Sequence, residues 1–233
     1  MKATTCLIIV SAFVVGCGGP SGYKPTPVAE SPKVEASAIT QASIMPIKTG
    51  TSWVYAMQTQ SRPANLVNAV NGDLTFSIAS VDPSPKGQKI TVELKTGDKL
   101  TDRQTWLLNE SGLYQLTAGL KDVAFTPMQP LVLFPVKEGA DFKWKGTGLC
   151  PDGVVGKMES ASHVLGSQLV DTAKGKESGL AIITVTKYSH GKAVGLLQST
   201  NWFKPNVGIV RLKQTLAVPK GAVETTLALK SSQ

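Results

Sequence analysis

The sequence predicts an all-β protein whose antiparallel strands form one strongly curved sheet or half-open barrel. Apolar residues alternate with polar ones at a period of two, turn residues separate these segments, and no long segment has a helical period. In residues 89–95, Ile90, Val92 and Leu94 share one face and polar or charged side chains share the other. Roughly ten such segments have the spacing of sandwiches, meanders or barrels.

The first residues of the chain are typical of a bacterial lipoprotein signal. Lys2 precedes an apolar run, residues 6–15, that matches a signal-peptide core. The run is too short for a membrane-spanning helix, which needs ~20 apolar residues. Gly16 supplies the small residue before Cys17, and the Cys17 thiol would receive a diacylglyceryl group. We expect residues 1–16 to be a signal peptide and Cys17 to carry fatty chains such as palmitate.

Lipidation at Cys17 would decide where the protein acts. Stable anchoring needs more than one acyl chain, which a diacylglyceryl group provides. The mature protein is therefore expected on a membrane of the cell envelope. Position 18 is Gly and not the Asp that marks inner-membrane retention, which favours the outer membrane if the organism has one. The alternative is ordinary secretion with a free thiol at Cys17.

Residues 17–44 are expected to form a flexible tether. The segment is rich in Pro, Gly, Ser, Ala and Thr and has no sustained apolar period. A flexible chain of this length reaches about 30 Å, and its prolines extend it further. The folded part would then stand clear of the lipid headgroups.

Residues 45–233 carry the strands and are expected to form one all-β domain. Alternation recurs at Leu74, Phe76 and Ile78, at Val210, Leu212, Leu216 and Val218, and at Val223, Thr225, Leu227 and Leu229. Turn residues separate the strands at 71–72, 82–87, 96–98, 109–112, 190–191, 205–208 and 219–221.

Internal similarity predicts two related halves, residues 45–133 and 134–233. Residues 46–55 share the pattern Pro-aliphatic-Lys-x-Gly-x-x-aromatic-x-aromatic with residues 135–144. Later in each half, Trp106 with Gly112 matches Trp202 with Gly208. Generic strand and turn patterns could also give this match. If the halves are duplicated, they would share one core.

Two segments carry a resemblance to known proteins. Residues 202–210, Trp-Phe-Lys-Pro-Asn-Val-Gly-Ile-Val, and the start at 134–139 resemble a pattern of bacterial lipoproteins and secreted β-proteins. Proteins of that kind are similar to the lipoprotein-localisation-factor fold, a curved antiparallel sheet that forms a half-open barrel. The resemblance implies architecture and carries no catalytic residue.

Composition narrows the classes of partner. The hydrophobic content of 42% is that of a folded chain. The net charge of +8 comes mainly from Lys, with only Arg62, Arg103 and Arg211, so it favours diffuse attraction to anionic surfaces over specific phosphate recognition. Because an exported protein does not meet nucleic acid in the cytoplasm, we do not expect nucleic acid as a partner.

The cysteines allow no internal disulfide in the mature protein. Once Cys6 has left with the signal and Cys17 is acylated, Cys150 remains without an internal disulfide partner.

Candidate catalytic groups are sparse. Cys150 with His163 could form a nucleophile and base, and Asp98 with Asp102 or Glu138 with Asp141 could act as acid and base. The sequence has no phosphate-binding loop, no serine-hydrolase elbow and only two histidines, His163 and His190, so we expect neither a cofactor nor a metal. An envelope hydrolase using these residues is the alternative hypothesis.

The aromatic residues are the best candidates for binding. Trp53, Tyr55, Trp106, Trp144 and Trp202 lie at or near matched positions of the two halves. Lining a concave sheet, they could hold an acyl chain, a glycan or a peptide, although core packing is the commoner role of strand aromatics. The sequence therefore favours a non-enzymatic, membrane-anchored lipoprotein whose β-domain binds or scaffolds a lipid-like or polymeric ligand.

Overall fold

The computed structural model describes residues 39–233. The predicted signal peptide (1–16), the acylated Cys17 and most of the predicted tether lie outside the described residues.

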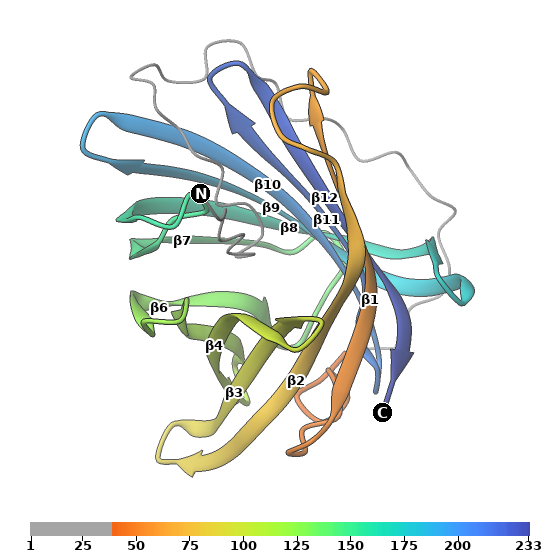
Figure 1. Ribbon diagram of the computed structural model, residues 1–233. Helices are drawn as coiled ribbons and strands as arrows, with labels where there is room; N and C mark the ends of the chain where they lie inside the picture. Colours follow the sequence, from red (N-terminus) through yellow and green to blue (C-terminus); the bar gives the residue numbers. More distant parts are fainter. Residues whose placement is uncertain (1–38) are drawn as a thin grey trace.

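Twelve antiparallel strands form a closed barrel in which each strand pairs with its neighbours in sequence and β12 pairs back to β1 (Figure 1). This confirms the predicted all-β antiparallel fold, and the curved sheet closes into a full ring. The strands are β1 (Ser52–Arg62), β2 (Val70–Ser84), β3 (Gly87–Thr96), β4 (Lys99–Asn109), β5 (Gly112–Ala118), β6 (Val123–Leu133), β7 (Asp141–Leu149), β8 (Val155–Thr172), β9 (Gly175–His190), β10 (Ala193–Lys204), β11 (Gly208–Val218) and β12 (Gly221–Ser232).

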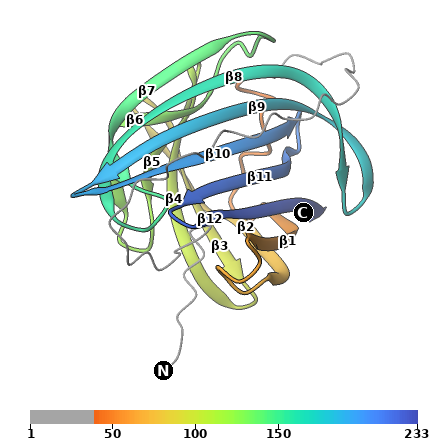
Figure 2. The same ribbon diagram turned by 90° about the horizontal axis from the view of Figure 1, so that it is seen from above.

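The long β8–β9 hairpin curls across the neighbouring strands. Its tip lies at the cyan end of the ribbon in Figures 1 and 2, and there the Ala173 N–H donates a hydrogen bond to the Leu229 carbonyl of β12 at 3.1 Å. Gln168 of β8 accepts a 2.9 Å hydrogen bond from the Trp202 indole of β10. The hairpin therefore covers part of β10–β12.

Residues 39–45 pack against the barrel at the end where β1 begins. Ile39 and Ile44 are at most 1% exposed, and the Asn206 N–H donates to the Ser43 carbonyl at 2.6 Å. The structure thus places two residues of the segment that the sequence assigns to the tether, Ile39 and Ile44, in the hydrophobic core. The apolar side chains of Ile39 and Ile44 explain this, because burying them removes apolar surface from water.

The barrel is weakest between β6 and β7. Only Thr126 and Thr147 pair across it, whereas β7 pairs with β8 along its whole length. Pro127 and Pro130 of β6 have no backbone N–H to donate to a neighbouring strand. Figure 1 shows the two strands diverging. The barrel therefore has a seam, which we define as the β6–β7 boundary.

The two predicted halves correspond to β1–β6 and β7–β12. Trp53 and Phe142 are the second residues of β1 and β7, and Gly112 and Gly208 begin β5 and β11. The matched segments thus fall on corresponding strands of two six-stranded halves, and their origin by duplication stays a prediction.

Candidate functional site: a cavity inside the barrel

A cavity of about 220 Å³ lies inside the barrel between its two apolar clusters. Its apolar lining includes four aromatic side chains: Phe76, Trp106, Phe125 and Phe203. Its polar lining consists of amides and hydroxyls: Gln104, Gln115, Gln129, Thr184, Thr186, Ser199, Asn201 and Gln214. The cavity therefore has both an apolar surface and hydrogen-bonding groups.

One wall is built on β4, β5 and β6. Trp106 pairs with Gln115, which in turn pairs with Gln129, so these three side chains form a row on one face of the sheet. The Trp106 indole N–H donates to Gln104 Oε1 at 3.0 Å, and Gln104 Nε2 donates to Asp102 Oδ2 at 2.8 Å. This chain of hydrogen bonds fixes the orientation of both lining side chains.

Asp102 anchors that wall from a buried position. Only 1% exposed, its carboxylate also accepts hydrogen bonds from the backbone N–H groups of Gly119 at 2.8 Å and Arg103 at 2.9 Å. Burial raises the pKa of Asp102 because it disfavours the charged form, and the three hydrogen bonds oppose that shift. The carboxylate is thus occupied by the protein itself.

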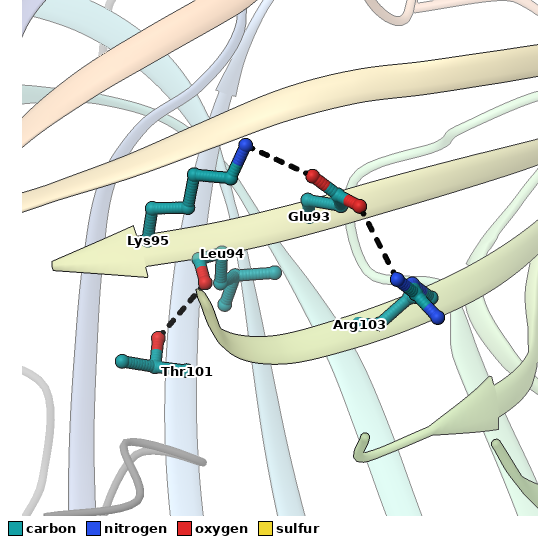
Figure 3. Close-up of polar contacts among 5 residues, drawn as sticks. All are labelled: Glu93, Leu94, Lys95, Thr101 and Arg103. Atoms are coloured by element: carbon teal, nitrogen blue, oxygen red, sulfur yellow. Dashed lines mark hydrogen bonds and ion pairs between the residues drawn. The ribbon is translucent and has the colours of Figure 1, made fainter. Parts of the chain in front are cut away.

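Contacts between β3 and β4, two of them on the face away from the cavity, hold the register of this wall (Figure 3). The Thr101 hydroxyl donates to the Leu94 carbonyl at 2.9 Å, beside the bulge between Leu94 and Lys95. Glu93 forms ion pairs with Lys95 at 3.0 Å and Arg103 at 3.4 Å. Its pKa is lowered, first by the hydrogen bond from Lys95. With Arg103 held on this face, its neighbours Asp102 and Gln104 point inward.

The facing wall is built on β9, β10 and β11. Thr184 pairs with Ser199, which pairs with Gln214, and Asn201 lies two residues further along β10. In the ring of twelve strands, β10–β11 lies five strands away from β5–β6, almost directly across the barrel. Polar groups thus face the cavity from both sides.

Of the five aromatics predicted to bind ligand, Trp106 lines the cavity. Trp53 and Tyr55 are core residues whose side chains donate to the carbonyls of Val207 at 2.6 Å and Ile209 at 2.8 Å. Burial raises the pKa of the Tyr55 hydroxyl far above its usual value. These two side chains join β1 to the start of β11.

Trp144 and Trp202 are also held by the protein. The Trp144 indole donates to the Pro127 carbonyl at 3.1 Å and its ring lies 6.1 Å from Phe125, so it packs across the seam. Trp202 is buried, and its indole N–H donates a hydrogen bond to Gln168. It lies on the opposite face of β10 from the cavity-lining Asn201 and Phe203.

The polar lining residues were missed by the sequence reasoning. Gln104, Gln115, Gln129, Asn201 and Gln214 occupy inward positions of strands whose pattern is not cleanly apolar. A signal was available: Gln104 and Trp106 are two residues apart and so share a face. Such a polar inward position marks a place where a core is not filled.

The structure does not bring Cys150 and His163 together. His163 Nδ1 lies 2.8 Å from Asp141 Oδ1 at the start of β7, whereas Cys150 follows the end of that strand, roughly 25–30 Å away at the rise of a β-strand. The Cys150 side chain is fully buried, and burial followed by the charge of Asp152 raises its pKa to about 12. The thiol is therefore protonated at neutral pH and is not a nucleophile.

Two of the candidate carboxylates, Asp102 and Asp141, are engaged elsewhere. Asp102 is bound by backbone N–H groups and Gln104, and Asp141 is paired with His163. His190 Nε2 lies 2.5 Å from Asp152 Oδ2 near the end of β9. Within residues 39–233, no three His, Cys, Asp or Glu side chains are grouped as a metal site would require. The same part of the chain contains no helix long and apolar enough to cross a membrane.

Comparison with known proteins finds similarity only among solved structures. No family model and no curated protein matches the sequence. A protein of Parabacteroides distasonis described as a lipoprotein is 11% identical, with coverage of 82% of this chain and 99% of that one and a TM-score of 0.49. A Bacteroides fragilis protein described as exported, with a YmcC-like fold, is 13% identical over 82% and 100%, with a TM-score of 0.48.

The hypothetical lipoprotein YmcC from Escherichia coli is 10% identical, with coverage of 77% of this chain and 88% of that one and a TM-score of 0.34. At such identities a similarity concerns the fold alone.

Proposed function

We propose that this chain is a lipid-anchored protein of the cell envelope whose barrel binds a small ligand in its cavity without catalysing a reaction. The cavity is the observation that carries the proposal. Its lining combines aromatic rings with carboxamide side chains that make no hydrogen bond within residues 39–233 and can therefore bind a ligand. Ligand pockets typically combine an apolar lining with a few polar groups that fix orientation.

The anchor comes from the first residues of the chain. The run at 6–15 ends at Gly16-Cys17, so acylation of Cys17 would hold the barrel at a membrane. Replacing Cys17 by Ser should move the protein from the membrane fraction to the soluble fraction on centrifugation. A Cys17→Ser variant that stays with the membranes would contradict the anchor.

Binding without catalysis fits the chemistry of the barrel. The cavity lining contains no Cys, His, Asp or Glu among the described residues, so it offers no ordinary general base to activate its Ser and Thr hydroxyls. The protonated Cys150 and the distant His163 give no support to the alternative of a hydrolase.

A filled cavity tests the binding proposal. Ser199→Phe would place a large ring in the cavity, whereas Val194→Phe adds the same ring at a position of the same strand that is 55% exposed. Small molecules released from each protein by denaturation, after purification from its own cells, are identified by mass spectrometry. We expect a stoichiometric compound with the wild type and Val194→Phe and none with Ser199→Phe. Equal recovery from both variants would overturn the proposal.

A further inference from the structure

Resting on the proposed function, we infer that the cavity takes an uncharged, hydroxyl-rich ring, namely a neutral saccharide unit, and not an acyl chain or a charged molecule. The inference comes from what lines the cavity, which of those groups the protein has already paired, and how much room is left.

Charge is kept away from the cavity. The chain has 24 Lys and Arg and 16 Asp and Glu, yet none of the described ones lines it. Asp102, which lies behind Gln104, is occupied by three hydrogen bonds from the protein. A charged ligand would lose its hydration without gaining a counter-ion. The lining therefore selects against ions.

Four carboxamides face the cavity with no partner from the described part of the protein. The side chains of Gln115, Gln129, Asn201 and Gln214 make no hydrogen bond with residues 39–233. Each offers two N–H donors and one acceptor oxygen. An acyl chain would displace their water and leave them unsatisfied, which is unfavourable. Hydroxyl groups, which both donate and accept, would satisfy them.

Aromatic rings supply the complementary surface. Trp106 lies beside Gln115, and Phe76 and Phe203 also reach the cavity. A sugar ring has an apolar face of C–H groups and an edge of hydroxyls, so it can pack on an aromatic ring while its hydroxyls reach carboxamides. The hydrogen bond from Trp106 to Gln104 keeps the indole in place before any ligand arrives.

The size of the cavity sets the length of the ligand. Its volume of about 220 Å³ equals that of roughly seven water molecules in the liquid. This is enough for one six-membered sugar ring and too little for an oligosaccharide. A longer glycan would leave its remaining units outside.

Direct binding measurements test the inference. Calorimetry on the full chain carrying Cys17→Ser is carried out with glucose, galactose, mannose and N-acetylglucosamine as neutral probes, glucuronic acid as a charged one and octanol as an apolar one. We expect at least one neutral sugar to bind and glucuronic acid and octanol to bind at least tenfold more weakly. Gln115→Leu and Gln214→Leu should each weaken the sugar at least tenfold, while the exposed Gln58→Leu should not.

The outcomes separate the two proposals. If octanol binds better than every sugar, and Gln214→Leu strengthens it, the ligand class is wrong while the cavity remains a binding site. If glucuronic acid binds best, the inference also fails. If none of the probes binds a protein that melts cooperatively, the saccharide inference fails. The binding proposal is then decided on its own by whether a compound is recovered from the wild type and Val194→Phe but not from Ser199→Phe.

Discussion

Asp102, Gln104 and Trp106 occupy three successive inward positions of β4 and depend on one another. The Asp102 carboxylate accepts three hydrogen bonds, from the Gln104 side chain and from the backbone N–H groups of Arg103 and Gly119, and these offset the cost of burying it. Removing the first member would leave Gly119 N–H, which is buried, and Gln104 without their acceptor. The positions of the lining side chains Gln104 and Trp106 therefore depend on Asp102.

Asp102→Ala should destabilise the protein by about 3 kcal/mol, because unsatisfied buried donors cost ~1–3 kcal/mol each. Asp102→Asn, which keeps an acceptor oxygen, should cost less than the Ala variant. Urea unfolding followed by tryptophan fluorescence measures both. Equal stability of Asp102→Ala and the wild type would mean that this hydrogen-bond chain does not hold the wall.

Cys150 should resist thiol reagents in the folded protein. It is buried with a pKa raised to about 12, so almost no thiolate exists at pH 8. We expect Cys150 to react with DTNB at least a hundredfold more slowly in native than in urea-unfolded protein, with Cys6→Ser and Cys17→Ser removing the two other thiols. Rapid native reaction would contradict the buried position.

The same pKa predicts a loss of stability in alkali. The unfolded thiol ionises near pH 9 and the folded thiol near 12, so the stabilisation is complete below pH 9 and is lost as pH rises toward 12. Tyr55 and Tyr188, whose pKa values burial also raises, contribute in the same direction at higher pH. Denaturant titrations from pH 8 to 11 should show a shallower decline for Cys150→Ala; an identical decline would contradict this assignment.

At the scale of elements, the sequence predicts strands well where one face is apolar. Residues 89–95 have that pattern and form most of β3. The pattern weakens in β4, β5 and β10, whose inward positions include Gln104, Gln115 and Asn201, because alternation identifies a filled core and not a lined cavity. Closure of the sheet depends on β1 meeting β12, a pairing that no local pattern encodes.

The seam should be the most open part of the barrel. A strand with few ladder hydrogen bonds has little local protection, and β6 and β7 share a single pair of residues. Hydrogen exchange measured by mass spectrometry should be faster for peptides of β6 than for peptides of β9, which pairs with neighbours along both edges. Equal protection of the two strands would contradict the seam.

The segment before β1 should consist of a part that stability does not require and a part that packs against the barrel. Deleting residues 24–38 should leave the melting temperature unchanged, because the tether prediction assigns them no packing role. Ile44→Ala should destabilise the barrel by about 2–5 kcal/mol, since Ile44 is fully buried. Calorimetry compares the two; a large fall after the deletion would mean that more of this segment is packed.

At the scale of the whole molecule, the described part is a barrel with one end filled and a polar-lined cavity further in. Residues 39–45 and the rings of Trp53 and Tyr55 fill the end where β1 begins. The sequence points to the aromatics as a group, but only the fold separates Trp106, beside the cavity, from those that join strands. That separation depends on strand register, which arises from pairings between residues far apart in the chain.

A crystal structure of the protein purified from its own membranes is the most direct test of a ligand-binding barrel. We predict electron density for a non-protein molecule in the cavity, in contact with Trp106 and within hydrogen-bonding distance of Gln115 or Gln214. A cavity filled by rearranged side chains, or occupied by water alone, would contradict the account.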